Sequence, residues 1–292
     1  MKICLSCGQR FVSDDWGCPC CHAFPELTND IFLSFAPGLA VSNEGFCAGY
    51  FEQLFKAESK NFWFRSRNQL LVWALRKFFP DAQSFFEIGC GTGYVLSGIR
   101  EGFPGLRLCG SDIFSSGLSF AQQRLPGVLL FQMDARRIPF EREFDVVGAF
   151  DVLEHIEEDV VVLQQMFQTA RPGGGVILTV PQHPFLWSVV DERSFHKRRY
   201  TRGELAEKVK KAGFRVVHVT SFVSFLLPLM LISRIQRERS RKEFDPSAET
   251  RIGGGANTVL EKILTVERAC ITRGFSFSAG GSLLMIAKRD RR

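Results

Sequence analysis

The stretch Phe85-Phe86-Glu87-Ile88-Gly89-Cys90-Gly91-Thr92-Gly93 constrains the fold of this chain more than any other feature. An apolar run ends at an acidic residue, and three glycines follow at alternate positions. This order predicts a buried strand, a tight loop and the start of a helix, because glycine lets the backbone approach a ligand closely. The spacing differs from the dinucleotide-binding pattern G-x-G-x-x-G, since Tyr94 or Leu96 would occupy its last glycine position.

Acidic residues also follow the next apolar segments. Asp112 ends the segment that begins at Leu106, and it lies 19 residues after Gly93. Doubly wound folds present an acid to ribose hydroxyls at about this spacing, and their ligands bind at the carboxyl ends of strands. Asp134 ends a third predicted strand, and Asp151 follows a fourth. Each acid alone is compatible with a helix cap, but their order favours a cofactor site.

The pattern E-x-G-x-G-x-G at Glu87 resembles the first motif of class I S-adenosylmethionine (SAM) methyltransferases. D-x-L-E-H at Asp151 resembles the quinone-biosynthesis-like branch of that family. The resemblance covers roughly residues 84–223 and a closing strand near 281–288. It implies an α/β fold with a Rossmann-like seven-stranded sheet and SAM as the cofactor. It also implies that the following residues bind SAM: Glu87, Gly89, Gly91, Gly93, Asp112, Ile113, Asp134, Ala135 and Phe150.

Two C-x-x-C pairs lie near the start of the chain, and they predict a structural zinc site. The expected ligands are Cys4, Cys7, Cys18 and Cys21. Cys20 or His22 could replace Cys21, and a redox or disulfide pair is the alternative to zinc. The sequence shows no export signal, so we expect a cytoplasmic protein with reduced thiols.

The residues after the cysteines, 23–33, resemble zinc ribbons that precede some methyltransferases. Such a ribbon either stabilises the chain as a metal-dependent cap or recognises a substrate or partner. We therefore expect a zinc ribbon at 1–35, a helical cap at 36–80 and the methyltransferase domain at 81–292. Helical spacing of apolar residues predicts cap helices over 44–60 and 68–79.

Further elements follow from spacing and from proline and glycine. A helix from Asp159 should end at Arg171-Pro172-Gly173-Gly174-Gly175, before a strand over 176–180. We expect a helix over 201–212, a strand over 214–223 and a last strand over 282–288. Residues 224–275 should form an insertion that covers the active site, with a loop over 243–256 and a helix over 257–272.

Three histidines are candidates for the group that removes a proton from the methyl acceptor, because imidazole titrates near neutral pH. We favour His155 and His196 over His183. Arg198 and Arg199 could hold an anionic acceptor, and Arg67 could bind the methionine carboxylate of SAM. The alternatives are a packing role for His155 and solvated loop charges for the other groups.

The acceptor is harder to predict. An apolar segment over 222–232 precedes a basic run, Arg234, Arg237, Arg239, Arg241 and Lys242, which suggests peripheral membrane contact and a lipid-linked acceptor. A buried strand end followed by a solvated helix is the alternative. We expect O-methylation of a small or lipid-linked (sugar or polyprenyl-type) acceptor.

Two other functions stay open: RNA methylation, and a non-catalytic SAM-binding or zinc adaptor role. The formal net charge of +6 is modest for an RNA-binding protein, and no proline-rich tetrapeptide follows the fourth strand. Both observations argue against a nucleic-acid partner. The intact glycine loop and the three acids argue against a protein without activity.

Overall fold

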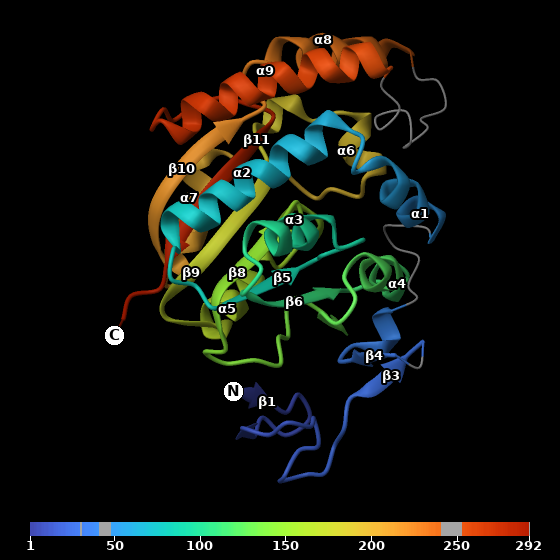
Figure 1. The fold of residues 1–292 in the computed structure, drawn as a ribbon, viewed down its shortest axis with the longest axis vertical. Coiled ribbons are helices and arrows are strands. Elements are labelled where there is room, and N and C mark those ends of the chain that lie inside the picture. Colours follow the sequence, from blue (N-terminus) through green and yellow to red (C-terminus); the bar gives the residue numbers. More distant parts are fainter. Residues whose placement is uncertain (30, 41–47, 241–252, 292) are drawn as a thin grey trace.

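A mixed sheet of nine strands runs through the computed structural model, which describes residues 1–29, 31–40, 48–240 and 253–291 (Figure 1). The strand order is β10-β11-β9-β8-β5-β6-β7-β4-β3. Strands β5 to β9 pair in parallel, whereas β11 is antiparallel to both β9 and β10. The bounds are β5 Ser84–Ile88, β6 Arg107–Asp112, β7 Leu129–Gln132, β8 Phe144–Phe150, β9 Ala170–Pro181, β10 Arg215–Phe222 and β11 Ser282–Lys288.

These seven strands confirm the predicted α/β, Rossmann-like sheet. Two short strands, β3 (Glu26–Thr28) and β4 (Phe32–Ser34), enlarge it to nine, because β4 pairs in parallel with the edge of β7. The backbone groups along a sheet edge need partners, and β4 supplies them. Part of the segment predicted as a zinc ribbon therefore belongs to the main sheet. The cysteine region has its own two-stranded sheet of β1 (Lys2–Ile3) and β2 (Arg10–Phe11).

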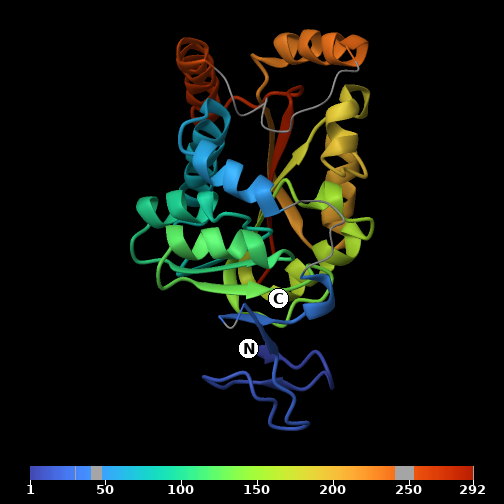
Figure 2. The ribbon, with the colours of Figure 1, turned by 90° about the vertical axis from the view of Figure 1, so that its right-hand side faces the viewer.

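Helices cover both faces of the sheet, which Figure 2 shows nearly edge-on. One face packs on helices α2, α3, α4 and α9, and the other on α5 and α7. The side chains of β5 alternate between these two cores, Phe85 in one and Phe86 in the other, as the pleat of a strand requires. The helix bounds are α1 Ala48–Ala57, α2 Phe62–Phe78, α3 Tyr94–Gly102, α4 Ser115–Arg124, α5 Asp159–Thr169, α6 Val189–Arg193, α7 Arg202–Lys211, α8 Leu227–Ser240 and α9 Gly254–Thr272.

The cap helices differ in length from the prediction. Helix α1 covers 48–57, and residues 44–47 lie outside the described part of the chain. Helix α2 begins at Phe62, earlier than the expected residue 68, because the Asn61 side chain accepts a hydrogen bond from the N–H of Trp63 and caps the helix. The helix expected over 201–212 is α7, and Thr201 caps it in the same way.

The glycines expected to end a helix lie in a strand instead. Helix α5 ends at Thr169, and β9 already begins at Ala170. A Cβ atom on Gly174 would lie 2.2 Å from the carbonyl oxygen of Asp145, and one on Gly175 would lie 2.1 Å from that of Ala287. These glycines are therefore required for close approach between strands rather than for a helix stop.

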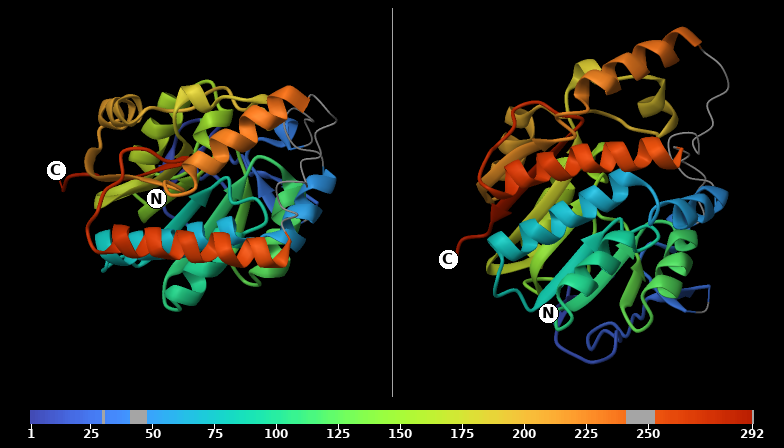
Figure 3. Two further views of the ribbon diagram at one scale, coloured as in Figure 1. Left: turned by 90° about the horizontal axis from the view of Figure 1, so that it is seen from above. Right: turned by 45° about the horizontal axis from the view of Figure 1, so that its top comes forward.

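The insertion between β10 and β11 supplies helices α8 and α9, which lie near the same end of the sheet (Figures 1 and 3). Helix α9 runs alongside α2 in both views of Figure 3. Helix α9 begins at Gly254, so the loop predicted over 243–256 is wrong for its last residues, and 243–252 lie outside the described residues. Buried Glu267 on α9 accepts a hydrogen bond from the N–H of Phe225 and ties α9 to the chain after β10.

Candidate active site and cysteine cluster

The glycine loop connects β5 to α3. It needs glycine because its backbone is left-handed at three positions and because neighbouring side chains leave no room for a Cβ at two of them. Gly89, Gly91 and Gly93 have φ angles of 70°, 51° and 74°, in the left-handed region. A Cβ on Gly89 would lie 2.4 Å from a methyl group of Val152, and one on Gly93 would crowd α4. Among the described residues, a Cβ on Gly91 would meet only Phe51 of α1, at 4.0 Å. Gly91 therefore borders open space between the loop and the cap.

Asp112 lies at the end of β6, directly beside this loop. Its carboxylate accepts hydrogen bonds from the N–H of Gly91 (2.8 Å) and of Phe114 (2.9 Å). Burial raises the pKa of Asp112 to about 6, although these backbone hydrogen bonds oppose the shift. The carbonyl oxygen of the next residue, Ile113, accepts a hydrogen bond from the Gln132 side chain. The predicted ribose-binding acid thus lies next to the glycine loop.

Glu87 lies in β5, just before the glycine loop, and the charge of Arg67 on α2 acts on it. One carboxylate oxygen of Glu87 is buried without a hydrogen-bond partner among the described residues. Burial raises the pKa of Glu87 to about 8, and the nearby Arg67 charge opposes the shift. Arg67 forms an ion pair with Asp151 and stacks 4.4 Å over the ring of Trp63. The partner of Arg67 in this structure is therefore a side chain of the protein.

The remaining predicted cofactor residues also lie at the ends of strands. Asp134 follows β7, and Arg136 binds both of its carboxylate oxygens at 2.8–3.0 Å. The next residue, Ala135, is buried. The Phe150 ring points into the core and stacks on Phe85 with a centroid distance of 6.4 Å. Only the backbone of Phe150 is thus left to face a ligand.

His155 and His196, which are far apart in the sequence, come together beyond the end of β8. Their ring centroids are 4.8 Å apart with the rings edge to face. Glu154 joins them, and one ligand atom of each of the three residues lies within 4.8 Å of the others. His183 is outside this group, and its Nε2 is buried without a hydrogen-bond partner among the described residues. The structure therefore brings two of the three candidate histidines into contact.

The environment of this group favours uncharged forms. Burial, together with the charge of His196, lowers the pKa of His155 to about 3. Burial raises the pKa of Glu154 well above its ordinary value, and neither of its carboxylate oxygens has a hydrogen-bond partner among the described residues. His196 has a hydrogen-bond partner, because its Nδ1 is 3.0 Å from Oδ1 of the buried Asp191.

The basic residues of the H-x-R-R-Y pattern are bound within the chain. Arg199 is buried and pairs with Asp191 at 2.7 Å, while Arg198 pairs with Asp159 at 3.0 Å. The Tyr200 hydroxyl donates to the same Asp159. Arg199 is buried and is therefore not a solvated loop charge, whereas Arg198 is partly exposed; both arginines are paired with acidic residues of the chain in this structure.

Asp191 is a residue of this region that the sequence did not single out. It accepts hydrogen bonds from His196, from Arg199 and from Arg234 of α8 (2.8 Å). The capping box formed by Ser188 and Asp191, with an acidic residue three positions after a serine, was the available signal. The partners of Asp191 come from distant segments, so the sequence spacing did not reveal its position.

Strained backbone gathers at the same edge of the sheet. Asp151, His183 and Val223 follow β8, β9 and β10, and their φ angles are 57°, 65° and 61°. A positive φ is rare for a β-branched residue such as valine. Because strained residues cluster at functional sites, this edge of the sheet is the candidate acceptor site.

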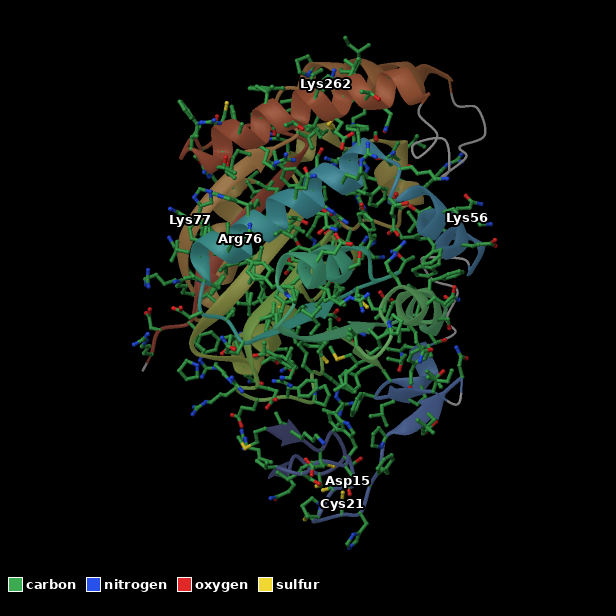
Figure 4. The ribbon with its side chains drawn as sticks, viewed as in Figure 1. Asp15, Cys21, Lys56, Arg76, Lys77 and Lys262 are labelled. Atoms are coloured by element: carbon green, nitrogen blue, oxygen red, sulfur yellow. The ribbon has the colours of Figure 1, made fainter. Side chains whose placement is uncertain are left out.

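The cysteine cluster lies at the opposite end of the molecule from α8 and α9; Figure 4 labels Cys21 there. The Sγ atoms of Cys4, Cys7, Cys18 and Cys21 lie within 4.8 Å of one another, and two of the pairs are 3.6 Å apart. Tetrahedral zinc with Zn–S bonds of about 2.3 Å requires sulfurs about 3.8 Å apart, so the four residues fit zinc. Cys20 and His22 are not part of this group.

Known proteins resemble this chain over its central part. Residues 55–219 match the family described as methyltransferase domain. The chain is 28% identical over 137 residues to trans-aconitate 2-methyltransferase of Azoarcus sp., covering 47% of this chain and 51% of the relative. It is 25% identical over 178 residues to phosphoethanolamine N-methyltransferase 2 of Caenorhabditis elegans, covering 57% of this chain and 40% of the relative. The chain thus spans about half the length of these relatives.

A solved structure shares the fold. Phosphoethanolamine N-methyltransferase 2 of Haemonchus contortus, in complex with S-adenosyl-L-methionine, superposes with a TM-score of 0.58 at 20% identity. The match covers 89% of this chain and 61% of that protein. At this identity the likeness shows the fold alone. Because the family match covers more than half of the 292 residues, the chain belongs to the methyltransferase domain family.

Proposed function

We propose that this protein transfers a methyl group from SAM to a hydroxyl group of a small acceptor. The observation that carries the proposal is the open space beside Gly91, which a Cβ would begin to fill, next to the Asp112 carboxylate. The buried Glu87 oxygen without a partner among the described residues also suits a ligand that donates hydrogen bonds. Both features fit the methionine and ribose parts of SAM.

The cofactor contacts in this proposal are those that the family resemblance implies. Gly89, Gly91 and Gly93 form the loop that would hold the methionine end together with Glu87, and Asp112 would bind the ribose. Ile113, Asp134, Ala135 and the backbone of Phe150 border the adenine. When bound, SAM supplies a methyl group on a sulfonium that needs no further activation.

The protein's own chemical task is to orient the acceptor and to remove its proton. We assign proton acceptance to His196, because the hydrogen bond from its Nδ1 to the buried Asp191 carboxylate orients the imidazole ring. His155 is a poor base at neutral pH, since its pKa is about 3, and we assign to it a hydrogen bond to the acceptor. Both histidines lie at the edge of the sheet where β8 and β9 end.

A structural zinc ion at Cys4, Cys7, Cys18 and Cys21 completes the proposal. The sulfur positions support it. Without metal, a segment this small has too little apolar surface to fold alone.

A lipid-linked acceptor is a narrower form of the same proposal. Phe225, Leu229 and Ile232 lie at the start of α8 or just before it, and each is about half exposed. Arg237 and the basic residues up to Lys242 lie beyond the side chains that the structure describes. Within the described residues, the helices fall short of the length and hydrophobicity that a membrane span needs.

The reaction can be tested with methyl-labelled SAM and a small-molecule cell extract, with and without RNase. We expect label in a small molecule, and we expect RNase to leave the yield unchanged. Label in RNA alone would favour the alternative RNA methyltransferase. Binding of SAM without any methyl transfer would favour an adaptor.

A further inference from the structure

The Gln132 side chain links the N-terminal segment to the cofactor site. Gln132 is the last residue of β7 and is completely buried. Its Oε1 accepts hydrogen bonds from Oγ of Ser34 (2.6 Å) and from the N–H of Ala36 (3.2 Å). Its Nε2 donates to the carbonyl oxygens of Ala36 (3.0 Å) and Ile113 (2.9 Å). All four hydrogen-bonding positions of this amide are therefore used.

The Gln132 side chain joins the chain at Ile113, beside the cofactor site, to the chain at Ser34. Ile113 directly follows Asp112, whose carboxylate binds the N–H of Gly91. The backbone next to Gln132 strengthens the connection, because the N–H of Met133 donates to the carbonyl oxygen of Asp112 (3.1 Å). Three of the four side-chain hydrogen bonds of Gln132 instead reach the chain around Ser34, which comes from the N-terminal segment.

Trp16 holds that N-terminal segment against the domain. Its ring contacts Phe35 edge-on at a centroid distance of 4.7 Å, and Phe131 and Phe140 at 5.5 and 5.4 Å. Trp16 lies two residues before Cys18, inside the loop that the four cysteines close. Order at the cysteine cluster therefore fixes Trp16, and Trp16 packs against the residue next to Ser34.

We propose that the N-terminal segment, residues 1–36, positions the adenosine side of the SAM site, and that Gln132 is the positioning residue that transmits metal binding at the cysteine cluster to that site. This inference rests on the proposed function, because it concerns the same cofactor. It goes further by giving the metal cluster a role in cofactor affinity, beyond capping the chain or recognising a substrate.

The physical reason is the loss of three hydrogen bonds on one side of a buried amide. Without metal, the loop around Trp16 loosens, and Phe35 and the chain at Ser34 lose their packing. Gln132 then needs new partners, and it no longer holds the Ile113 carbonyl in one place. Ligand binding must then order the chain around Ile113 again, and the free-energy cost of this ordering weakens the observed affinity.

The test measures the affinity of the full chain for S-adenosylhomocysteine by calorimetry, with zinc bound and after chelation. We expect chelation to weaken binding about tenfold. Gln132→Met keeps an unbranched side chain but removes the hydrogen bonds, and it should weaken binding similarly. Chelation of this variant should then have little further effect. Gln123→Met, on the exposed side of α4, is the matched control and should behave like the wild type.

Hydrogen exchange adds a readout that does not depend on the ligand. Chelation should speed exchange in peptides that cover residues 31–36 and 111–116 together. If Gln132→Met does not fold, Ser34→Ala removes one of the four hydrogen bonds and should show a smaller effect in the same direction.

Two outcomes would overturn the inference, and they differ in what else they affect. If chelation speeds exchange at 31–36 but leaves the affinity of the wild type unchanged, the link through Gln132 is wrong and the proposed function stands. If the zinc-loaded wild type fails to bind S-adenosylhomocysteine at all, the proposed function fails as well.

Discussion

Nδ1 of His196 lies 3.0 Å from Oδ1 of Asp191, a carboxylate that is completely buried. The hydrogen bond to His196, followed by the charges of Arg199 and Arg234, keeps Asp191 ionised against the effect of burial and holds its pKa far below the ordinary value. The pair therefore resembles the arrangement in which a carboxylate orients an imidazole ring. Helix α8 takes part through Arg234, so the insertion and the candidate base are connected.

His196→Gln should lower kcat by about 100-fold, because the variant lacks the group that removes the proton from the methyl acceptor. Affinity for S-adenosylhomocysteine should stay within about twofold, since His196 is not among the cofactor residues. Turnover can be measured once the labelled-SAM screen has found an acceptor. His22→Gln, on the exposed cysteine loop, is the control. Unchanged turnover in His196→Gln would assign proton removal to another group.

Gly91→Val should weaken the binding of S-adenosylhomocysteine by about 100-fold. The new side chain would occupy the space beside the loop, and valine tolerates a φ of 51° poorly. Gly127→Val is the matched control, because Gly127 also has a left-handed φ, of 81°, and a Cβ there meets no atom of the described residues within 4 Å. Calorimetry on both variants gives the comparison. Equal binding by the two variants would contradict the placement of SAM against Gly91.

Affinity for S-adenosylhomocysteine should rise with pH through about 6, the pKa of Asp112 in the folded protein. Above this pH the carboxylate can accept hydrogen bonds from ribose hydroxyls, and below it the group is protonated. Asp112→Asn should bind weakly with little dependence on pH between 5 and 8. A wild-type affinity that is flat across this range would show that Asp112 does not meet the ribose.

The same pKa has a consequence for stability. Because burial raises the pKa of Asp112 above its ordinary value, the folded state binds more protons than the unfolded state between about pH 4 and 6. The contribution of this group to the free energy of unfolding is therefore fully present below pH 4 and decreases as the pH rises to 6. Denaturant titrations at several pH values should show that the free energy of unfolding decreases between about pH 4 and 6 more steeply in the wild type than in Asp112→Asn.

Cys21→Ser should abolish zinc binding, whereas Cys20→Ser should retain one zinc ion per chain. The two cysteines are adjacent and both exposed, but only Cys21 belongs to the four-sulfur group. Elemental analysis of protein purified without chelator distinguishes the variants. If Cys21→Ser retained zinc and Cys20→Ser lost it, Cys20 rather than Cys21 would be the fourth ligand. Absence of metal from the wild type would refute the site.

If the acceptor is lipid-linked, Leu229→Asp should reduce the binding of the protein to anionic vesicles in a flotation assay. Leu229 is 52% exposed on α8, and a charge there opposes insertion into the interface. Val259→Asp on α9, at a position 58% exposed, is the control and should float like the wild type. A wild-type protein that stays in solution would leave a soluble small molecule as the better acceptor.

The sequence alone determined the elements whose signals are local. The strand β5, the glycine loop and the acid at the end of β6 follow from short-range patterns, because a left-handed turn needs glycine wherever the chain later lies. The cysteine group is also local, since two C-x-x-C pairs a few residues apart limit which sulfurs can meet.

Only the tertiary structure decided which distant segments meet. The pairing of β4 with β7, the contact between His155 and His196, and the bond from Asp191 to Arg234 join residues far apart in the chain. These contacts depend on sheet order and on packing across an edge, and no residue carries that information in its neighbours. The distant partners of Gln132 and Asp191 were therefore invisible in the sequence, because folding alone brings them to these buried polar side chains.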